Sequence, residues 1–207
     1  MEGQWLSWVK RLHAIASTGL HYSQGDYDRE RYQEVATIAG DMLAALAASP
    51  IPGLENLDAD FGFGYATPKV DVRGAVFRGN GILLVRELSD GLWTLPGGFA
   101  DVGLSPGENV VKEIWEEASV KVTAKILYGV RHKARHEYSP DVLDLYKLFF
   151  LCECVDDAEP KAGLETAEAR FFGRNEIPPL SRGRTLEKDI AEAFAVRDNP
   201  QGVTYFD

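Results

Sequence analysis

Three glutamates in the middle of the chain, Glu113, Glu116 and Glu117, have the spacing of a possible metal site. They occupy positions i, i+3 and i+4 of a segment with helical periodicity, so the three carboxylates lie on neighbouring positions of one helix face. Like charges at this spacing repel one another, whereas hard divalent cations such as Mg²⁺ bind carboxylate, carbonyl and water oxygens. The pattern therefore indicates either a solvated acidic helix face or a Mg²⁺ site that also holds a diphosphate.

The residues just before this helix favour the metal site. Pro96 ends the preceding β-rich run, and it is followed by Gly97 and Gly98. Two glycines allow backbone conformations, and a close approach to a ligand, that a Cβ would obstruct. We therefore expect a bent glycine loop beside the acidic face, and with that loop upstream a bound cation explains the glutamates better than a solvated face does.

The segments around the loop and helix predict an α/β (α+β) domain. Four runs are rich in β-forming residues: Val70–Phe77, Gly81–Leu88, Lys121–Val130 and Asp144–Val155. Helical patterns cover Gly107–Ala118 and Thr185–Arg197. Strands interspersed with two helices are typical of helices packed on a mixed sheet.

The first part of the chain predicts a small helical hairpin. Apolar residues recur at helical spacing over Trp5–Ala16 and again over Val35–Leu46, and the polar, glycine-containing segment Ser17–Asp28 separates them. Such a hairpin cannot bury its apolar stripes alone, so it must pack on the following domain or on a second subunit, and we expect a homodimer. The stretch Ser49–Pro68, rich in Pro, Gly and Asp, marks the boundary. The expected domains are residues 1–60 and 66–207.

Charge and composition exclude some classes of partner. The formal net charge is −10, which argues against binding nucleic acid, because phosphate neutralisation needs a surplus of Lys and Arg on one face. No window approaches eighteen apolar residues, so we expect neither a membrane span nor a signal peptide. Cys152 and Cys154 alternate on a β-rich run, where a disulfide between them would be strained. Free thiols fit a cytoplasmic protein.

The segment PGGFADVGLSPGENVVKEIWEEASV, residues 96–120, resembles the Nudix box. That pattern reads Gly, five residues, Glu, seven residues, Arg-Glu, an aliphatic residue, any residue, Glu-Glu, any residue, Gly and an aliphatic residue. Counted from Gly98, the matching carboxylates are Glu113, Glu116 and Glu117. Three positions depart from the pattern: Leu104 for the first Glu, Lys112 for Arg and Ser119 for Gly. The first two departures put in doubt the ion pair that usually braces the loop, and they leave metal binding intact.

The resemblance extends over nearly the whole chain. The segments VDVRGAVF, LLVREL, YKLFFLCE, ETAEARFF, EIPPLSRGRT and the terminal YFD are similar to a Nudix branch that bears an N-terminal helical domain. Members of that branch are described as ADP-ribose or CDP-choline pyrophosphatases. The resemblance implies a Nudix-type α/β/α sandwich with a mixed sheet, preceded by a helical hairpin that takes part in dimer formation. It also implies metal-dependent hydrolysis of the diphosphate bond of a nucleoside diphosphate linked to another moiety, with release of a nucleoside monophosphate.

The resemblance assigns roles to residues of the box. The three box glutamates and the main-chain carbonyl of Gly97 would bind Mg²⁺, or Mn²⁺ in its place. Such a cation neutralises the charge that develops on the diphosphate and helps to generate hydroxide from a bound water. In diphosphate-sugar Nudix enzymes the general base often comes from a loop outside the box. Glu165 is our candidate and Glu168 the second, because both precede a predicted strand, although an exposed loop carboxylate can also be merely solvated.

Basic residues outside the box have two interpretations each. Arg73 and Arg86 lie on predicted strands, where a guanidinium either holds phosphate oxygens bidentately or forms an ordinary ion pair. The cluster Arg131, His132 and Lys133 follows a strand and fits either substrate contact or a solvated turn. At the level of the whole protein, the rival interpretation is a catalytically weak Nudix-like module that binds a nucleotide. The altered box positions favour that module, and the intact carboxylates argue against it.

Overall fold

The computed structural model describes residues 3–46, 65–200 and 204–207 of the 207-residue chain. Its contacts form two compact units, which are described separately: Met1–Lys69 with Ala134–Leu145, and Val70–Lys133 with Tyr146–Asp207. Most of the predicted boundary, Ser49–Pro68, lies outside the described residues. Nothing in the sequence pattern indicates that residues 134–145 belong with the first unit.

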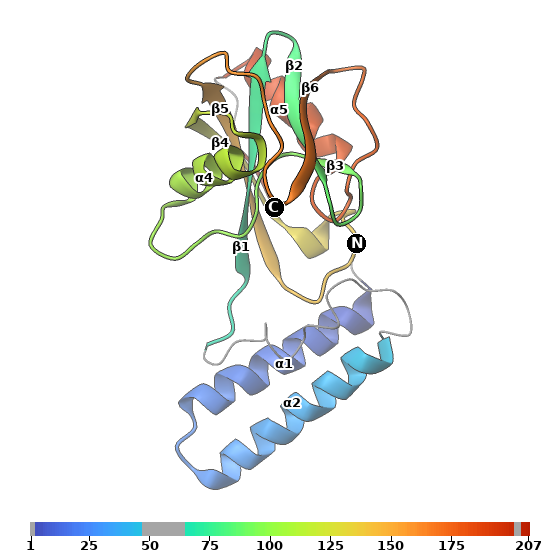
Figure 1. The fold of residues 1–207 in the computed structure, drawn as a ribbon. Coiled ribbons are helices and arrows are strands. Elements are labelled where there is room, and N and C mark those ends of the chain that lie inside the picture. The colour runs from blue at the N-terminus through green and yellow to red at the C-terminus, as the bar shows by residue number, and fades with distance from the viewer. Residues whose placement is uncertain (1–2, 47–64, 201–203) are drawn as a thin grey trace. The chain divides into compact units, whose positions relative to one another are not determined.

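The first unit contains the predicted helical hairpin, made of α1 (Gln4–Tyr22) and α2 (Asp26–Leu46) (Figure 1). Its apolar core consists of Leu6, Val9, Ala39 and Leu43. The connection is shorter than the expected Ser17–Asp28, because α1 continues through Gly19 to Tyr22. A Cβ on Gly19 would clash with the ring of Tyr32 on α2, so this glycine serves helix packing and does not mark a turn.

Polar contacts connect α1 to the second segment of this unit. The buried Lys10 donates to the carbonyl oxygen of Leu143 at 3.1 Å and pairs with the Asp144 carboxylate, also at 3.1 Å. The main-chain N–H of Lys69 donates to the carbonyl of Asp144 at 2.9 Å. A buried lysine is costly unless it is paired, so these contacts hold residues 141–144 against α1.

The second unit is built on a mixed sheet. In the described residues its seven strands are β1 (Lys69–Arg78), β2 (Gly81–Glu87), β3 (Trp93–Thr94), β4 (Val122–His132), β5 (Leu145–Cys154), β6 (Thr166–Gly173) and β7 (Tyr205–Phe206). The order is β3-β2-β1-β5-β4-β7, with β6 beside β2, and β7 runs parallel to β4. The four predicted strands are confirmed, and the cysteines on β5 are free as expected. The strands β3 and β7 have two residues each, which is too short to produce a pattern in the sequence.

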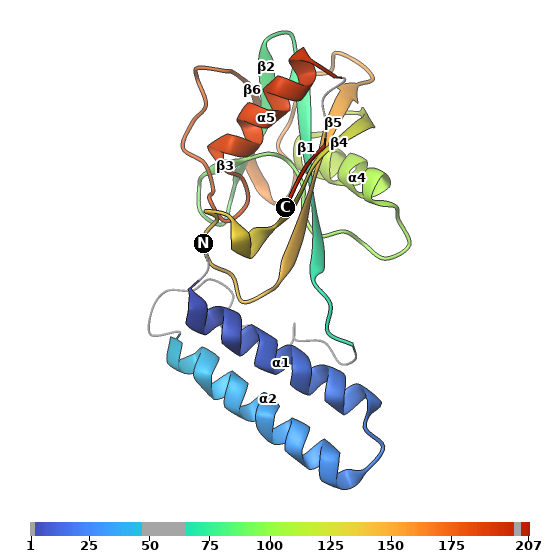
Figure 2. The same cartoon turned by 180° about the vertical axis from the view of Figure 1, so that it is seen from behind.

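Two helices cover the sheet, and the alternation of β1 shows on which faces. Val72 and Val76 share a core with Ile114 of α4 (Pro106–Ala118). Phe77 points to the other face, where its ring lies 4.9 Å from that of Phe194 on α5 (Glu187–Asp198). The two views show α4 and α5 on opposite sides of the sheet (Figures 1 and 2). This confirms the expected sandwich. A short 3₁₀ helix, η2, covers Lys133–Arg135.

No helix in the described ranges has the length and apolar character needed to cross a membrane.

A buried ion cluster joins β1, β5 and the chain that leads into the glycine loop. Arg73 binds the Asp71 carboxylate with two nitrogens, at 2.7 and 3.0 Å, and Lys147 binds the same carboxylate at 2.6 Å. Arg73 also donates to the main-chain carbonyl of Leu95 at 3.2 Å. All three charged side chains are buried. The cluster thus fixes the position of the chain two residues before Gly97.

The charged side chains of this cluster differ in how well their ion pairs offset the cost of burying the charge. Burial would raise the pKa of Asp71, but Arg73 and Lys147 hold it well below its ordinary range. Burial lowers the pKa of Lys147 to about 8, although Asp71 opposes this shift. The asymmetry arises because Asp71 faces two cations, whereas Lys147 has a second cation, Arg73, beside the anion that it binds. Asp71 is therefore the charge that the cluster most depends on.

We predict unequal effects on stability when the two ends of the cluster are removed. Asp71→Asn removes the carboxylate that pairs with both buried cations and should lower the free energy of unfolding by about 3–5 kcal/mol. Lys147→Met keeps the bidentate Asp71–Arg73 pair and should change stability by only about 1 kcal/mol. Urea unfolding of both variants tests this, and equal losses would contradict the asymmetry.

The effect of Asp71→Asn should also depend on pH. The folded-state pKa of Asp71 lies below the ordinary value of 3.8, so its contribution is fully present above that value and is lost as the pH falls toward the folded-state pKa. The difference in unfolding free energy between the wild type and the variant should therefore stay constant between about pH 5 and pH 7 and shrink below about pH 4.

Candidate active site

The helix that carries the three glutamates begins at a well-defined cap. Ser105 accepts a hydrogen bond from the Glu108 N–H, the Glu108 carboxylate accepts one from the Ser105 N–H at 2.8 Å, and Pro106 is the first helical residue. This capping box fixes where α4 starts and hence which way the glutamates face. The helix ends at Ser119, which adopts φ 55° in the left-handed region where the box pattern has glycine.

The glycine loop lies along β1. Three backbone hydrogen bonds of 2.8–2.9 Å join residues 96–100 to β1. Gly97 has φ 145°, and a Cβ there would clash with the carbonyl oxygen of Val72, so only glycine fits. The Gly97 N–H donates to the Glu117 carboxylate at 2.8 Å. The predicted loop is therefore held between β1 and the acidic face of α4.

The three glutamates have different surroundings. Glu117 is only 7% exposed and receives the hydrogen bond from Gly97. The Glu113 carboxylate lies directly against the second glycine, since a Cβ on Gly98 would stand 2.7 Å from its Oε2. The Glu116 side chain is 53% exposed and pairs with Lys112 at 2.7 Å. Two of the three carboxylates thus face the glycine loop, and the third is turned to a lysine.

The two inward carboxylates lack sufficient counter-charge. Burial raises the pKa of Glu117 to about 8, with Arg73 and the Gly97 N–H opposing the shift and Glu87 and Glu113 adding to it. Burial also raises the pKa of Glu113. A cation beside them would supply the missing positive charge. Their oxygen donors, together with a glycine cradle that a Cβ would fill, fit a hard divalent metal.

Only two of the three glutamates, Glu113 and Glu117, face the glycine loop, so the three carboxylates do not converge on one point. In residues 3–46, 65–200 and 204–207, no group of three or more His, Cys, Asp or Glu side chains is close enough to hold a metal ion. The pairing of Glu116 with Lys112 accounts for the missing third carboxylate. A cation bound by all three glutamates therefore requires Glu116 to leave Lys112.

Other residues brace the loop in place of the missing ion pair of the box. Asn109, only 1% exposed, accepts from the Asp101 N–H at 2.8 Å and donates to three loop carbonyls at 3.2–3.3 Å. Lys112 pairs with the Asp101 carboxylate at 3.2 Å, whereas Leu104 is 40% exposed. Sequence reasoning missed Asn109 and Asp101. The available signal was an asparagine inside a helix, where this residue commonly bonds to nearby backbone.

The segment before β6 is attached to the end of α4. The Gly163 N–H and the Thr166 hydroxyl both donate to the main-chain carbonyl of Glu117, at 3.1 and 2.8 Å. A Cβ on Gly163 would clash with the carbonyl of Glu116. The candidate base Glu165 is exposed and stands between these two anchors. Its charge contributes to the raised pKa of Glu87, for which burial is the largest cause.

The second candidate base is not on a loop. Glu168 lies within β6, opposite Arg86 on β2, and pairs with its guanidinium at 2.7 Å with both side chains partly exposed. The expectation that Glu168 precedes the strand is wrong, because β6 already begins at Thr166. Arg86, a candidate for phosphate binding, therefore has a carboxylate partner that is open to solvent.

The remaining basic candidates lie in the interior. Arg73 belongs to the buried cluster with Asp71 and Lys147. Arg131 is buried and pairs with Asp189 and Glu192 of α5, and Lys133 is also buried. Arg131 and the half-buried His132 lie on β4, and Lys133 begins η2, so Arg131 and Lys133 do not occupy a solvated turn.

Glu87, at the end of β2, is a further acidic residue that sequence reasoning missed. It is buried, pairs with Arg184 at 3.3 Å and raises the pKa of Glu117. Strand alternation is the only signal that could have indicated its burial.

Two family models match the chain. The model described as "UDP-X-like, N-terminal oligomerisation domain" matches residues 3–57, and the model of the NUDIX domain matches residues 67–194. The second match covers more than half of the chain and includes the glycine loop and α4.

Similar proteins are found among curated relatives and solved structures. The Bacillus subtilis (strain 168) protein YjhB, whose name provisionally assigns it as an ADP-ribose pyrophosphatase, is 42% identical over 207 residues, covering 100% of this chain and 99% of the relative. A crystal structure of a UDP-X diphosphatase is 32% identical with a TM-score of 0.63 and covers 98% of each chain. An ADP-ribose pyrophosphatase from Streptococcus suis 89-1591 is 36% identical with a TM-score of 0.62, covering 68% of this chain and 100% of that chain.

The matched NUDIX domain contains the glycine loop, the capped helix and the glutamates described above. The chain belongs to the Nudix family of hydrolases, with a UDP-X-like N-terminal oligomerisation domain ahead of its Nudix domain.

Proposed function

We propose that this Nudix pyrophosphatase uses Mg²⁺, or Mn²⁺, to hydrolyse the diphosphate bond of a nucleoside diphosphate linked to another moiety, releasing a nucleoside monophosphate. The observation that carries the proposal is the pair of inward carboxylates, Glu113 and Glu117, held against a glycine loop with too little counter-charge. Nudix hydrolases generally need a divalent metal, usually Mg²⁺.

The substrate class follows from the relatives. The names of the Bacillus subtilis relative and the Streptococcus suis structure favour a compound of the ADP-ribose type. The UDP-X diphosphatase extends the candidates to other nucleoside diphosphate compounds. CDP-choline is supported only by the resemblance of the sequence to the branch with the helical domain.

The proposed chemistry assigns one task to each part of the site. Glu113, Glu116, Glu117 and the carbonyl of Gly97 would hold the metal, which supplies charge neutralisation and a more acidic bound water. The absence of side chains at Gly97 and Gly98 lets the loop lie against β1 and against the Glu113 carboxylate, which keeps the loop carbonyls close to the metal ligands. Glu165 would accept a proton from the attacking water while the oxygen of that water bonds to phosphorus. The bridging P–O bond then breaks, and the second phosphate leaves.

The two candidate arginines take different roles in this proposal. Arg86 is half-exposed, and by releasing Glu168 it would bind a phosphate oxygen. Arg73 is buried on Asp71 and Leu95, so it would act by positioning the loop and Glu117.

A nucleotide-binding module with weak catalysis is the second candidate. The pairing of Glu116 with Lys112 favours it, because the third carboxylate is turned away from the loop. Turnover measurements separate the two candidates.

We expect metal-dependent monophosphate release from a panel of ADP-ribose, CDP-choline, UDP-glucose and nucleoside triphosphates. Glu117→Gln should lower kcat by about 10²-fold or more, because it removes a charged ligand while keeping the shape of the side chain. Chelation with EDTA should abolish turnover in the wild type. Nucleotide and metal binding without any turnover would support the binding module.

We also predict that Asn109 is needed to hold the loop in its active geometry. Asn109→Ala leaves loop carbonyls without donors and should lower the unfolding free energy by about 1–3 kcal/mol and kcat by about 10- to 100-fold. Leu104→Ala is the matched control, because this side chain takes no part in the bracing, and its kcat should stay within about twofold of the wild type. A larger loss in the control than in Asn109→Ala would contradict this role.

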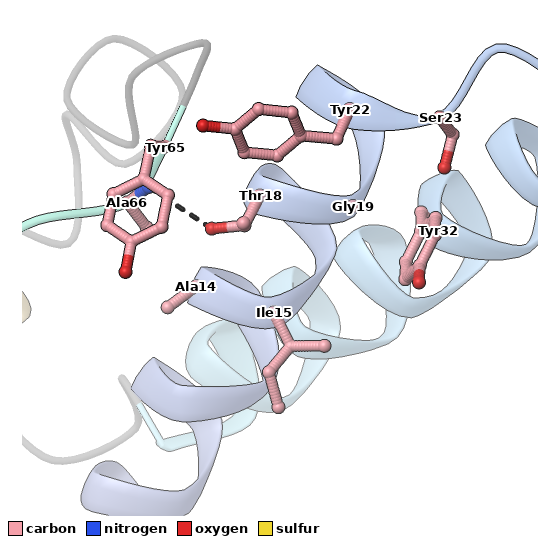
Figure 3. A pocket seen from close by; sticks show the side chains of 9 residues that line it. All are labelled: Ala14, Ile15, Thr18, Gly19, Tyr22, Ser23, Tyr32, Tyr65 and Ala66. Carbon is pink, nitrogen blue, oxygen red and sulfur yellow. Dashed lines mark hydrogen bonds between the residues drawn. The ribbon is translucent and has the colours of Figure 1, made fainter.

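We propose that a face of α1 forms a homodimer with a second copy of the chain. Large apolar side chains on this helix are exposed at intervals of three, four and seven residues: Trp5, Trp8, Leu12, Ile15 and Tyr22. At its end, Tyr22 and Tyr65 line a groove of about 590 Å³ (Figure 3). An exposed apolar stripe of this kind is typical of an interaction surface, and the matched oligomerisation model supports the choice of a second copy.

If this face forms the dimer, placing charged residues in the apolar stripe of α1 should convert the dimer to a monomer. The double variant Trp8→Glu/Ile15→Glu should elute as a monomer in size-exclusion chromatography with light scattering, because burying two carboxylates at an apolar interface is unfavourable. Ile38→Glu, on an exposed position of α2, should leave the assembly unchanged. A wild-type monomer at micromolar concentration would rule out the dimer.

A further inference from the structure

Lys112 lies among the carboxylates that would hold the metal. Its Nζ is 2.7 Å from Glu116, 3.2 Å from Asp101 and 3.9 Å from Glu113. The ammonium group therefore stands beside the one box glutamate that is turned away from the glycine loop. A positive charge of this chain already neutralises part of the site.

A lysine is suited to move between two acidic partners. Its ammonium is a compact charge on a flexible stem, whereas the guanidinium expected at this position of the box is a rigid, planar fork. Asp101 and Glu116 are both within ion-pair distance of Nζ, so the lysine bridges them and can keep Asp101 as its partner when it loses Glu116. Asn109 holds the main chain of Asp101 in place, which keeps this second partner available.

A metal and Lys112 compete for Glu116. If Glu116 bound a cation while Lys112 stayed at 2.7 Å, two positive charges would lie close together and repel each other. Asp101 offers the lysine an alternative partner outside the metal ligands. Resting on the proposed function, we propose that Lys112 is an exchangeable counter-ion, which neutralises Glu116 before the metal binds and is held by Asp101 alone when Glu116 joins the metal.

The exchange predicts how Lys112 and Asp101 each change the apparent metal affinity. Lys112 lowers the apparent metal affinity, because it must be displaced from Glu116. Asp101 raises the affinity, and it does so through Lys112, so its effect disappears when the lysine is absent. If Lys112 and Asp101 only braced the loop, removal of either would weaken metal binding. If they acted only as distant charges, their effects would add.

A double-mutant cycle on the full-length protein tests the exchange. Mn²⁺ affinity is measured by isothermal titration calorimetry without substrate for the wild type, Lys112→Gln, Asp101→Asn and the double variant. Lys112→Gln should tighten Mn²⁺ binding about threefold to tenfold, and Asp101→Asn should weaken it by a similar factor. In the Lys112→Gln background, Asp101→Asn should change the affinity by less than about twofold.

Controls separate this inference from the proposed function. Lys125→Gln, which removes an exposed lysine paired with Glu153 at 3.1 Å, should leave Mn²⁺ affinity unchanged. Lys112→Met should repeat the result of Lys112→Gln, and thermal unfolding checks that each variant is folded. Weaker binding in both lysine variants, or an Asp101→Asn effect of equal size in both backgrounds, overturns the exchange. A wild type that neither binds Mn²⁺ nor turns over substrate sinks the proposed function itself.

Discussion

The short contact between the Gly97 N–H and the Glu117 carboxylate is the interaction on which the site depends. It requires the loop to run so close to β1 that no Cβ fits at Gly97, and it requires α4 to present Glu117 toward that loop. The first requirement is met by the backbone hydrogen bonds along β1, and the second by the cap at Ser105. Strand, loop and helix are therefore fixed relative to one another before any ligand is present.

Charge extends this arrangement into the interior. Arg73 is bound to Asp71, supports the chain at Leu95 and lowers the pKa of Glu117 against the effect of burial. The buried cluster therefore stabilises the second unit and also tunes a residue of the site. Arg73 can have both effects while it stays buried next to the loop and out of reach of a substrate. The charges of the buried cluster and of the candidate site therefore form one connected set.

The parts that the sequence predicted are those encoded locally. The glutamates repeat within one helix, the glycines precede them directly, and strand and helix patterns appear in runs of several residues. Arg131 was harder to interpret, because its partners Asp189 and Glu192 lie on α5. Arg73 pairs with Asp71 on its own strand, but the burial of this pair depends on the contacts with Leu95 and with Lys147 of β5. The bracing role of Asn109 depends on how the loop folds back on the helix, and Gly19 was read as a turn because its contact with Tyr32 is between two helices. The role of each of these residues depends on contacts between segments that are far apart in the sequence or fold back on one another.

The attachment of residues 163–166 to the end of α4 has a consequence for how such a protein can diversify. Glu165 stands between two residues that bond to the carbonyl of Glu117, so the candidate base is tied to the helix that carries the three glutamates. Residues 155–160 join β5 to this anchored segment. Insertions or substitutions there would leave the spacing between Glu165 and the three glutamates of α4 unchanged. Under the proposed function, the chain between β5 and residue 163 could vary among relatives without changing the hydrolytic groups.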